Sequence, residues 1–167
     1  MPVIVTLVAG ADGSTSKGGN SSGITTPVDR TEFLARRRTA DCIIIGGNTA
    51  RNEPYQRTPV PVIVLSRSLI NPLANNRLAH CWNLSPVKAL ARAAQKFGPT
   101  IHIEAGVSII SELLAAGAID KLELSITPII GGEDKIELTE LLDYFDHIHE
   151  EIREGVRFIS AQAKLAS

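Results

Sequence analysis

Aromatic residues and cysteines are both scarce in this chain of 167 residues, which has four Phe, two Tyr, one Trp and two Cys. With so few rings, the core must be built from Ile, Val, Leu and Ala. Two cysteines cannot form a disulfide framework, and Cys42 lies in the apolar run CIII, where a small buried thiol is common. We therefore expect a reducing compartment and one domain over residues 1–167.

Long apolar runs and a strong net charge are also missing. The run VIVTLVA is too short to span a bilayer and follows no basic leader, so we expect a soluble, cytoplasmic protein. The net charge of −1 argues against nucleic acid or a membrane as the main partner. Residues 1–99 nevertheless carry twelve Lys+Arg against five Asp+Glu. Such a basic half would suit a phosphate-rich small molecule, although solvated helix faces explain any single charge equally well.

Segments rich in Val and Ile recur along the chain and alternate with helical or turn-like segments, which indicates an α/β fold. The apolar segments are 2–9, 42–45, 60–65, 100–103, 122–130 and, with weaker alternation, 155–162. Two of them, 42–45 and 60–65, are almost continuously apolar, as expected for strands covered on both faces. We predict a three-layer α/β/α arrangement around a mixed, mainly parallel central sheet, with antiparallel strands near the C-terminus.

Helix signals stand between these strands. Asp29 is a candidate cap for the first helix, with Glu32 three residues later, and Ser85 and Gly98 bound a second helix that ends at Phe97. A further helix is predicted over 137–152. The Gly/Ser/Thr-rich segment 10–27 reads as a long loop, and such loops are usually lids or disordered connectors.

The most informative stretch is 102–132, HIEAGVSIISELLAAGAIDKLELSITPIIGG. It reads as a strand, a turn at Gly106, a helix over 107–116, a stop at Gly117 and a second strand. The unpaired N–H groups and the positive dipole end of such a helix start favour an anion such as a pyrophosphate. The carboxylate of Glu104 beside it suggests a second, polar ligand.

A second strand runs into Gly46 and Gly47, where Asn48 or Thr49 could cap a short helix. Two such starts in one sheet suggest a dinucleotide, or a cofactor plus a phosphorylated substrate, although glycine after a strand is often plain turn chemistry. Neither GxGxxG nor GxxxxGK[ST] occurs, so the Rossmann fingerprint and the P-loop are unsupported. The turn 66–68, Ser-Arg-Ser, could bind the 2′-phosphate of NADPH or be an ordinary turn.

The sequence gives little support for a metal site or for nucleophilic catalysis. On a helix, His147 and His149 would point about 200° apart and could not easily share a metal ion, so we predict no metal site. No nucleophile elbow or Cys-His pairing is visible, and we assign no catalytic residue. His102, inside a strand, is expected to be a packed core histidine.

Taken in order, four segments resemble one family over about residues 3–132. They are VTLVAGADG, SSGITTPVDRTEFLARRRTADCIIIGGNTARNEP, PVIVLSRS and IHIEAGVSIISELLAAGAIDKLELSITPIIGG. The family is the reductase domain of bacterial riboflavin biosynthesis, the C-terminal half of the bifunctional pyrimidine deaminase/reductase. The resemblance implies a dihydrofolate-reductase-like fold, NADPH as the hydride donor, a homodimer, and reduction of a phosphorylated ribosylaminopyrimidine at C1 of its ribosyl group.

The resemblance also implies site residues. The positions where the family holds NADPH are Ala9, Thr49, Ser66, Arg67, Gly106, Val107, Ser108 and Ile109. The positions where it holds the pyrimidine and the ribose phosphate are Ser21, Arg37, Arg57 and Glu104. Arginines suit a phosphate, and a buried carboxylate suits the N–H edge of a pyrimidine.

Three positions depart from the family pattern, because Thr6, Gly10 and Glu53 stand where the family has Lys, Ser and Asp. These departures fall on the substrate side and near the nicotinamide. They leave open a reductase of a different small substrate, or a non-catalytic relative that binds a nucleotide or a pyrimidine. A doubly wound nucleotide-binding module is a third alternative, which would require purely parallel strands.

Overall fold

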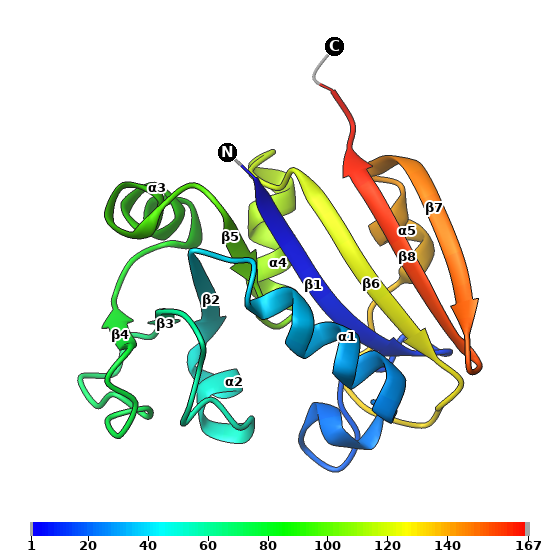
Figure 1. Ribbon diagram of the computed structural model, residues 1–167, viewed down its shortest axis with the longest axis horizontal. Coiled ribbons are helices and arrows are strands. Elements are labelled where there is room, and N and C mark those ends of the chain that lie inside the picture. The colour runs from blue at the N-terminus through cyan, green and yellow to red at the C-terminus, as the bar shows by residue number, and fades with distance from the viewer. Residues whose placement is uncertain (1, 166–167) are drawn as a thin grey trace.

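The computed structural model describes residues 2–165 and contains one eight-stranded sheet in the order β4-β3-β2-β5-β1-β6-β8-β7 (Figure 1). The strands are β1 (Val3–Gly10), β2 (Cys42–Gly46), β3 (Val62–Leu65), β4 (Ala79–Trp82), β5 (Ile101–Ile103), β6 (Lys121–Thr127), β7 (Phe145–Arg153) and β8 (Val156–Ala163). The first six run parallel, and β8 and β7 join antiparallel. The prediction of a mixed, mainly parallel sheet is confirmed.

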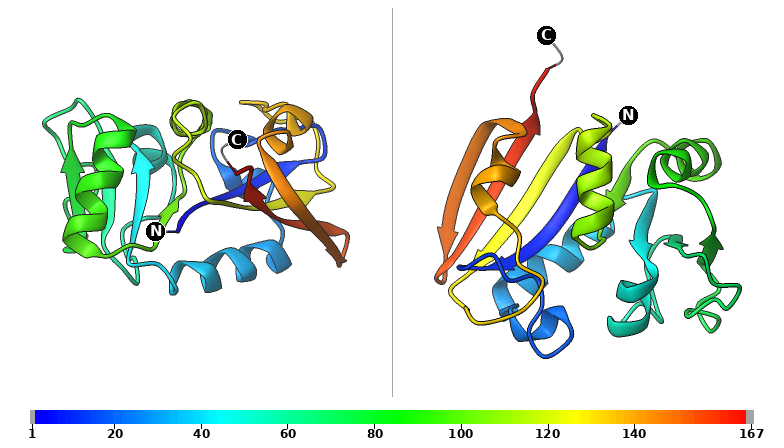
Figure 2. Two further views of the ribbon diagram at one scale, coloured as in Figure 1. Left: turned by 90° about the horizontal axis from the view of Figure 1, so that it is seen from above. Right: turned by 180° about the vertical axis from the view of Figure 1, so that it is seen from behind.

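Helices cover both faces of this sheet. They are the 3-10 helix η1 (Ser21–Gly23), α1 (Pro27–Arg37), α2 (Gly47–Asn52), α3 (Pro86–Phe97), α4 (Val107–Ala115) and α5 (Leu138–Leu142). Figure 2 shows α1 on one face and α4 and α5 on the other. Within residues 2–165, no helix is long and apolar enough to cross a membrane.

The core is aliphatic, as predicted. Its main cluster joins the strand residues that face α3, α4 and α5, and a smaller cluster surrounds Ala50 of α2. Cys42 belongs to the main cluster, and burial raises the pKa of its thiol to about 12. The thiol therefore stays protonated and packs as a small apolar group.

The predicted helix over 137–152 is wrong. Only Leu138–Leu142 is helical, and the following residues form β7, which pairs with β8 through a two-residue turn at Glu154 and Gly155. Both turn residues have positive φ, at 51° and 79°, as hairpin turns of this length require. The strand in the apolar segment 122–130 is β6, which ends at Thr127.

Two helix caps differ from the prediction. Thr26, not Asp29, caps α1. Asp29 is the third residue of the helix and completes a capping box, because its carboxylate accepts from the backbone N–H and the hydroxyl of Thr26. Gly46 precedes α2 as its cap, so neither Asn48 nor Thr49 has that role. The short edge strand β4 was not predicted.

The loop over residues 10–20 is fixed by hydrogen bonds to residues 129–136. Backbone bonds join Ser16 and Glu133 in both directions, and the N–H of Ile136 donates to the carbonyl of Gly13. Gly13 has φ 86°, and an added Cβ there would lie 2.2 Å from the carbonyl oxygen of Ile136. In the structure these hydrogen bonds connect the loop to residues 129–136, and part of the loop lines the cavity described below.

His102 is a packed core residue, as predicted, with 2% of its surface exposed. Burial and the nearby cation of Arg36 lower its pKa below 6.5. The unfolded chain therefore binds a proton near pH 6.5 that the folded chain does not, and folding stability should fall as the pH drops below that value.

We expect His102→Leu to flatten this loss in urea unfolding measured from about pH 8 to about pH 5. Part of the slope should remain because burial, Lys96 and Arg92 also lower the pKa of His80. If the dependence of unfolding stability on pH is the same in the variant, His102 has the same pKa in the folded and the unfolded chain, and this explanation is wrong.

A cavity at the carboxyl ends of the parallel strands

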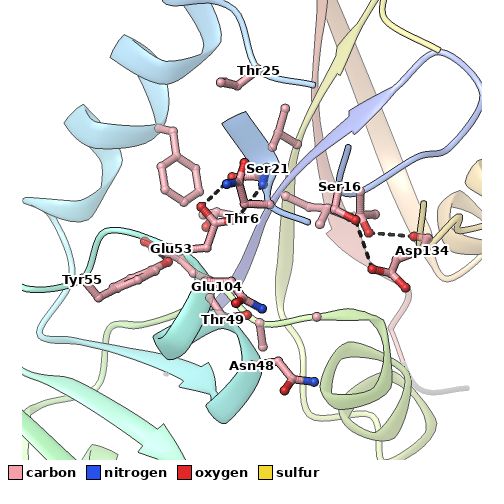
Figure 3. Close-up of a pocket in the computed structure, with 18 of the residues that line it drawn as sticks. Thr6, Ser16, Ser21, Thr25, Asn48, Thr49, Glu53, Tyr55, Glu104 and Asp134 are labelled. Atoms are coloured by element: carbon pink, nitrogen blue, oxygen red, sulfur yellow. Dashed lines mark hydrogen bonds between the residues drawn. The ribbon is translucent and has the colours of Figure 1, made fainter. Parts of the chain in front are cut away.

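A cavity of about 480 Å³ opens beside the middle of β1, at the carboxyl ends of β2 and β5, the usual place for ligands in open α/β sheets (Figure 3). We call it the central cavity. Its walls come from the middle of β1, the segment after β5, one face of α1 along its whole length, the turn around η1, and the beginnings of α2 and α4.

A buried ion pair lies at the floor of this cavity. The Nε of Arg37 donates to Oε1 and Oε2 of Glu104 at 3.0 and 3.2 Å, and its Nη2 lies 2.8 Å from Oε1. The hydroxyl of Tyr55 donates to the same Oε1 at 2.6 Å. Oε1 is thus saturated, whereas Oε2 and the outer N–H groups of Arg37 keep capacity for a ligand.

Aromatic rings hold the guanidinium of Arg37 in place. It lies 4.9 Å from the ring centre of Phe33 and 4.6 Å from that of Tyr55. Burial raises the pKa of the Glu104 carboxyl, and Arg37 and Tyr55 oppose that rise. Burial lowers the pKa of Arg37, but Glu104 and Tyr55 together raise it, and the net direction is upward. A rigid acceptor and a rigid cation therefore stand side by side at the floor.

Glu53 holds the turn that forms one wall. Its carboxylate accepts from the backbone N–H of Ser21 at 2.6 Å and from the Ser21 hydroxyl at 2.9 Å (Figure 3). Glu53 stands where the family pattern has Asp, and here it fixes η1 against α2. Ser21 reaches the cavity, but its hydroxyl proton is already committed to Glu53.

Thr6 lies next to Glu104, one step beyond the paired residues Val5 and Ile103 of β1 and β5. It lines the cavity and is 3% exposed. In the described part of the chain its hydroxyl has no hydrogen-bond partner. This small side chain takes the place of the family's lysine and leaves the floor without that cation.

A second cavity, of about 530 Å³, lies on the other side of the α4 start, and we call it the outer cavity. Ser66 and Arg67 line it, and Gly106 and Ser108 line both cavities. The α4 cap residue Gly106 has no side-chain cap bond, and an added Cβ there would meet no atom within 4 Å. The free N–H groups of this helix start thus face open space between the two cavities.

Most of the predicted site residues line a cavity. Those on the central cavity are Ser21, Arg37, Thr49, Glu104, Gly106, Val107 and Ser108, and Ile109 joins Ser66 and Arg67 on the outer one. Ala9 is fully buried in the core, and Arg57 is exposed; neither lines these cavities. The prediction missed Tyr55, Phe33 and Arg30, which line the central cavity and carry no local sequence signal.

The argument against a metal at His147 and His149 assumed a helix, and that premise is wrong. Both residues are exposed on β7, at a register shift where His147 has φ 51°. Within residues 2–165, no group of three or more His, Cys, Asp or Glu side chains is placed to hold a metal ion.

Comparison with known families identifies the chain. Residues 2–144 match the model of the RibD C-terminal domain. The chain belongs to the RibD C-terminal domain family. The predicted resemblance to the reductase domain of riboflavin biosynthesis is thereby confirmed. No curated protein sequence matches the chain significantly.

Solved structures show the same fold at low sequence identity. A riboflavin biosynthesis protein of Shewanella sp. PV-4 superposes with a TM-score of 0.78 at 21% identity, over 99% of this chain and all of that one. Dihydrofolate reductase from Enterococcus faecalis, complexed with NADP(H), gives a TM-score of 0.72 at 16% identity, over 97% and 96% of the two chains. The dihydrofolate-reductase-like fold is confirmed.

The Thermotoga maritima diaminohydroxyphosphoribosylaminopyrimidine deaminase/5-amino-6-(5-phosphoribosylamino)uracil reductase gives a TM-score of 0.73 at 15% identity. The match covers 98% of this RibD C-terminal domain chain but only 56% of that protein. The chain therefore spans little more than half the length of this bifunctional neighbour.

Proposed function

We propose that this RibD C-terminal domain protein is an NADPH-dependent pyrimidine reductase of riboflavin biosynthesis, acting on 5-amino-6-(5-phosphoribosylamino)uracil. The family and the names of its structural neighbours support this reaction class. The observation that carries the proposal is the shared position of the α4 start, which borders both cavities. A dinucleotide lying along the outer cavity would reach a substrate on the floor of the central one.

The central cavity suits the proposed substrate chemically. A uracil ring presents N–H groups beside carbonyl oxygens along its edge. Oε2 of Glu104 can accept from such an N–H, and the outer N–H groups of Arg37 can donate to the neighbouring carbonyl. Because both side chains are held by Tyr55 and Phe33, little side-chain entropy is lost on binding.

The outer cavity suits the proposed cofactor. The N–H groups of Ser108 and Ile109 at the α4 start favour a pyrophosphate, and Arg67 with Ser66 favours a 2′-phosphate. When bound, NADPH supplies the hydride for C1 of the ribosyl group. The protein's own residues hold the two molecules in register and keep water from the reacting carbon.

The selectivity for NADPH can be tested at Arg67. We expect Arg67→Ala to weaken NADPH binding by about tenfold or more while NADH binding changes little, because only NADPH carries the 2′-phosphate. Titrations followed by nicotinamide fluorescence measure both affinities. Arg77, which is exposed and lies outside both cavities, provides the matched control Arg77→Ala.

The reaction itself is tested by mixing purified protein with NADPH and 5-amino-6-(5-phosphoribosylamino)uracil and following nicotinamide oxidation. Formation of the ribityl product supports the proposal. NADPH binding without turnover of this substrate would favour the non-catalytic alternative or a different substrate. The homodimer implied by the resemblance and the cytoplasmic location expected from the sequence stay predictions.

A further inference from the structure

We propose that Arg30, on the second turn of α1, binds the 5′-phosphate of the substrate. This inference rests on the proposed function, which gives the substrate a phosphate. The site residues implied by the resemblance do not include Arg30. The structure points to it because, of the two arginines that the resemblance suggested for this task, Arg37 is paired with Glu104 and Arg57 lines neither cavity.

The first of these, Arg37, is occupied by another anion. Its guanidinium makes three contacts of 3.2 Å or less with Glu104 and is stacked against Phe33 and Tyr55. Glu104 balances its positive charge at the floor of the cavity. A phosphate dianion placed there would lie against a buried carboxylate, which like-charge repulsion opposes strongly.

The second, Arg57, does not reach the cavity. It is exposed in the segment between α2 and β3, and it lines neither cavity. Lysine is also missing from the floor, because Thr6 stands at the position of the family's lysine. The central cavity therefore has no phosphate-binding cation from these three positions.

Arg30 is the remaining cation on the wall of the central cavity among the described residues. Its side chain is exposed, and within residues 2–165 no carboxylate lies close enough to form an ion pair with it. The neighbouring Asp29 is 1% exposed and is bound by Thr25 and Thr26. The guanidinium of Arg30 is thus free to bind a phosphate in two-point fashion.

Arg30 and Phe33 also lie on the same face of α1, three residues apart, and both line the cavity. A ring held at Glu104 and Arg37, beside Phe33, would extend its ribosyl phosphate along α1 toward Arg30. The distance between the floor and Arg30 then sets the length of substrate that the cavity accepts.

The test compares the phosphorylated substrate with 5-amino-6-ribosylaminouracil, the same compound without phosphate. For Arg30→Gln we expect the KM of the phosphorylated substrate to rise about ten- to a hundredfold, with kcat nearly unchanged and the KM of the dephosphorylated compound unaltered. Arg30→Glu should raise the first KM further. Arg38→Gln, at the exposed residue that directly follows α1 and lies outside the cavity, is the control and should match the wild type.

Each failure has its own signature. If the wild type reduces neither compound, the proposed function is wrong and this inference falls with it. If the wild type reduces both with equal KM, or if Arg30→Gln leaves the phosphorylated KM unchanged, the reductase stands and the role of Arg30 is wrong. Equal losses for both compounds in Arg30→Gln would show a structural role and also overturn the proposal.

Discussion

Replacing Arg37 by methionine is expected to lower the free energy of unfolding by about 3–5 kcal/mol and to abolish binding of the pyrimidine. The substitution keeps the aliphatic bulk that packs against Phe33 and Tyr55 but removes the charge. It leaves Glu104, which is 6% exposed, as a buried carboxylate without its cation. The loss of stability comes mainly from that unpaired charge, since the pair itself contributes little net stability.

The pH dependence provides an internal check on this explanation. Burial raises the pKa of Glu104 even with Arg37 present, and loss of the cation should raise it further. A carboxyl group with a raised folded-state pKa destabilises the protein most at high pH and regains its proton as the pH falls. The stability difference between Arg37→Met and wild type should therefore shrink from about pH 8 to about pH 5 in urea unfolding.

Two variants separate charge from packing. Adding Glu104→Gln to Arg37→Met removes the buried charge and keeps an acceptor oxygen for the Tyr55 hydroxyl, so most of the lost stability should return while pyrimidine binding stays absent. Arg38→Met, at the exposed residue directly after α1, should change stability by no more than about 0.5 kcal/mol. An Arg37→Met variant as stable as wild type would contradict the buried-pair explanation.

The parts of the fold that follow from local signals were predictable. Gly106 and Gly117 bound a helix of the predicted length, and Gly117 has the expected positive φ of 64°. The apolar runs identified six of the eight strands, and β7 was missed because its hydrophobic periodicity is not that of a strand. Its apolar residues Phe145, Ile148 and Ile152 are spaced as on a helix, and pairing with β8 overrides that spacing.

The sequence did contain a signal against the helix over 137–152. Glu154 and Gly155 form the type of two-residue turn that closes a hairpin, and the alternating segment 155–162 follows directly. Weighing that turn would have indicated a strand before it. The edge strand β4 has no comparable signal, because its four residues, Ala79–Trp82, show neither alternation nor a continuous apolar run.

At the site, the sequence predicted which types of residue serve a ligand but not which of them contact each other. The sequence suggested that Arg37 and Glu104 both serve a ligand, but 67 positions separate them, and no local pattern shows that they bind each other. Tyr55 follows Pro54 after the short helix α2, a position typical of a loop residue. In the fold it is only 3% exposed and its hydroxyl donates to Glu104. Such pairings arise from the strand order, which sequence periodicity does not determine.

Replacing Gly106 by aspartate is expected to weaken NADPH binding by more than about a hundredfold while leaving the protein as stable as before or slightly more stable. Aspartate is a preferred helix cap, and Gly106 has extended backbone angles and open space around its missing Cβ. The new carboxylate would accept from the free N–H groups at the α4 start and add a favourable charge at the dipole's positive end.

The same carboxylate would occupy the place proposed for the pyrophosphate. Loss of binding with a gain of a few tenths of a kcal/mol in stability cannot arise from misfolding, so fluorescence titration and urea unfolding of one variant test the site directly. Gly106→Ala is the matched control, because a methyl group there meets no atom within 4 Å and adds no charge. It should bind NADPH far better than Gly106→Asp, and equal affinities for the two variants would place the pyrophosphate away from the α4 start.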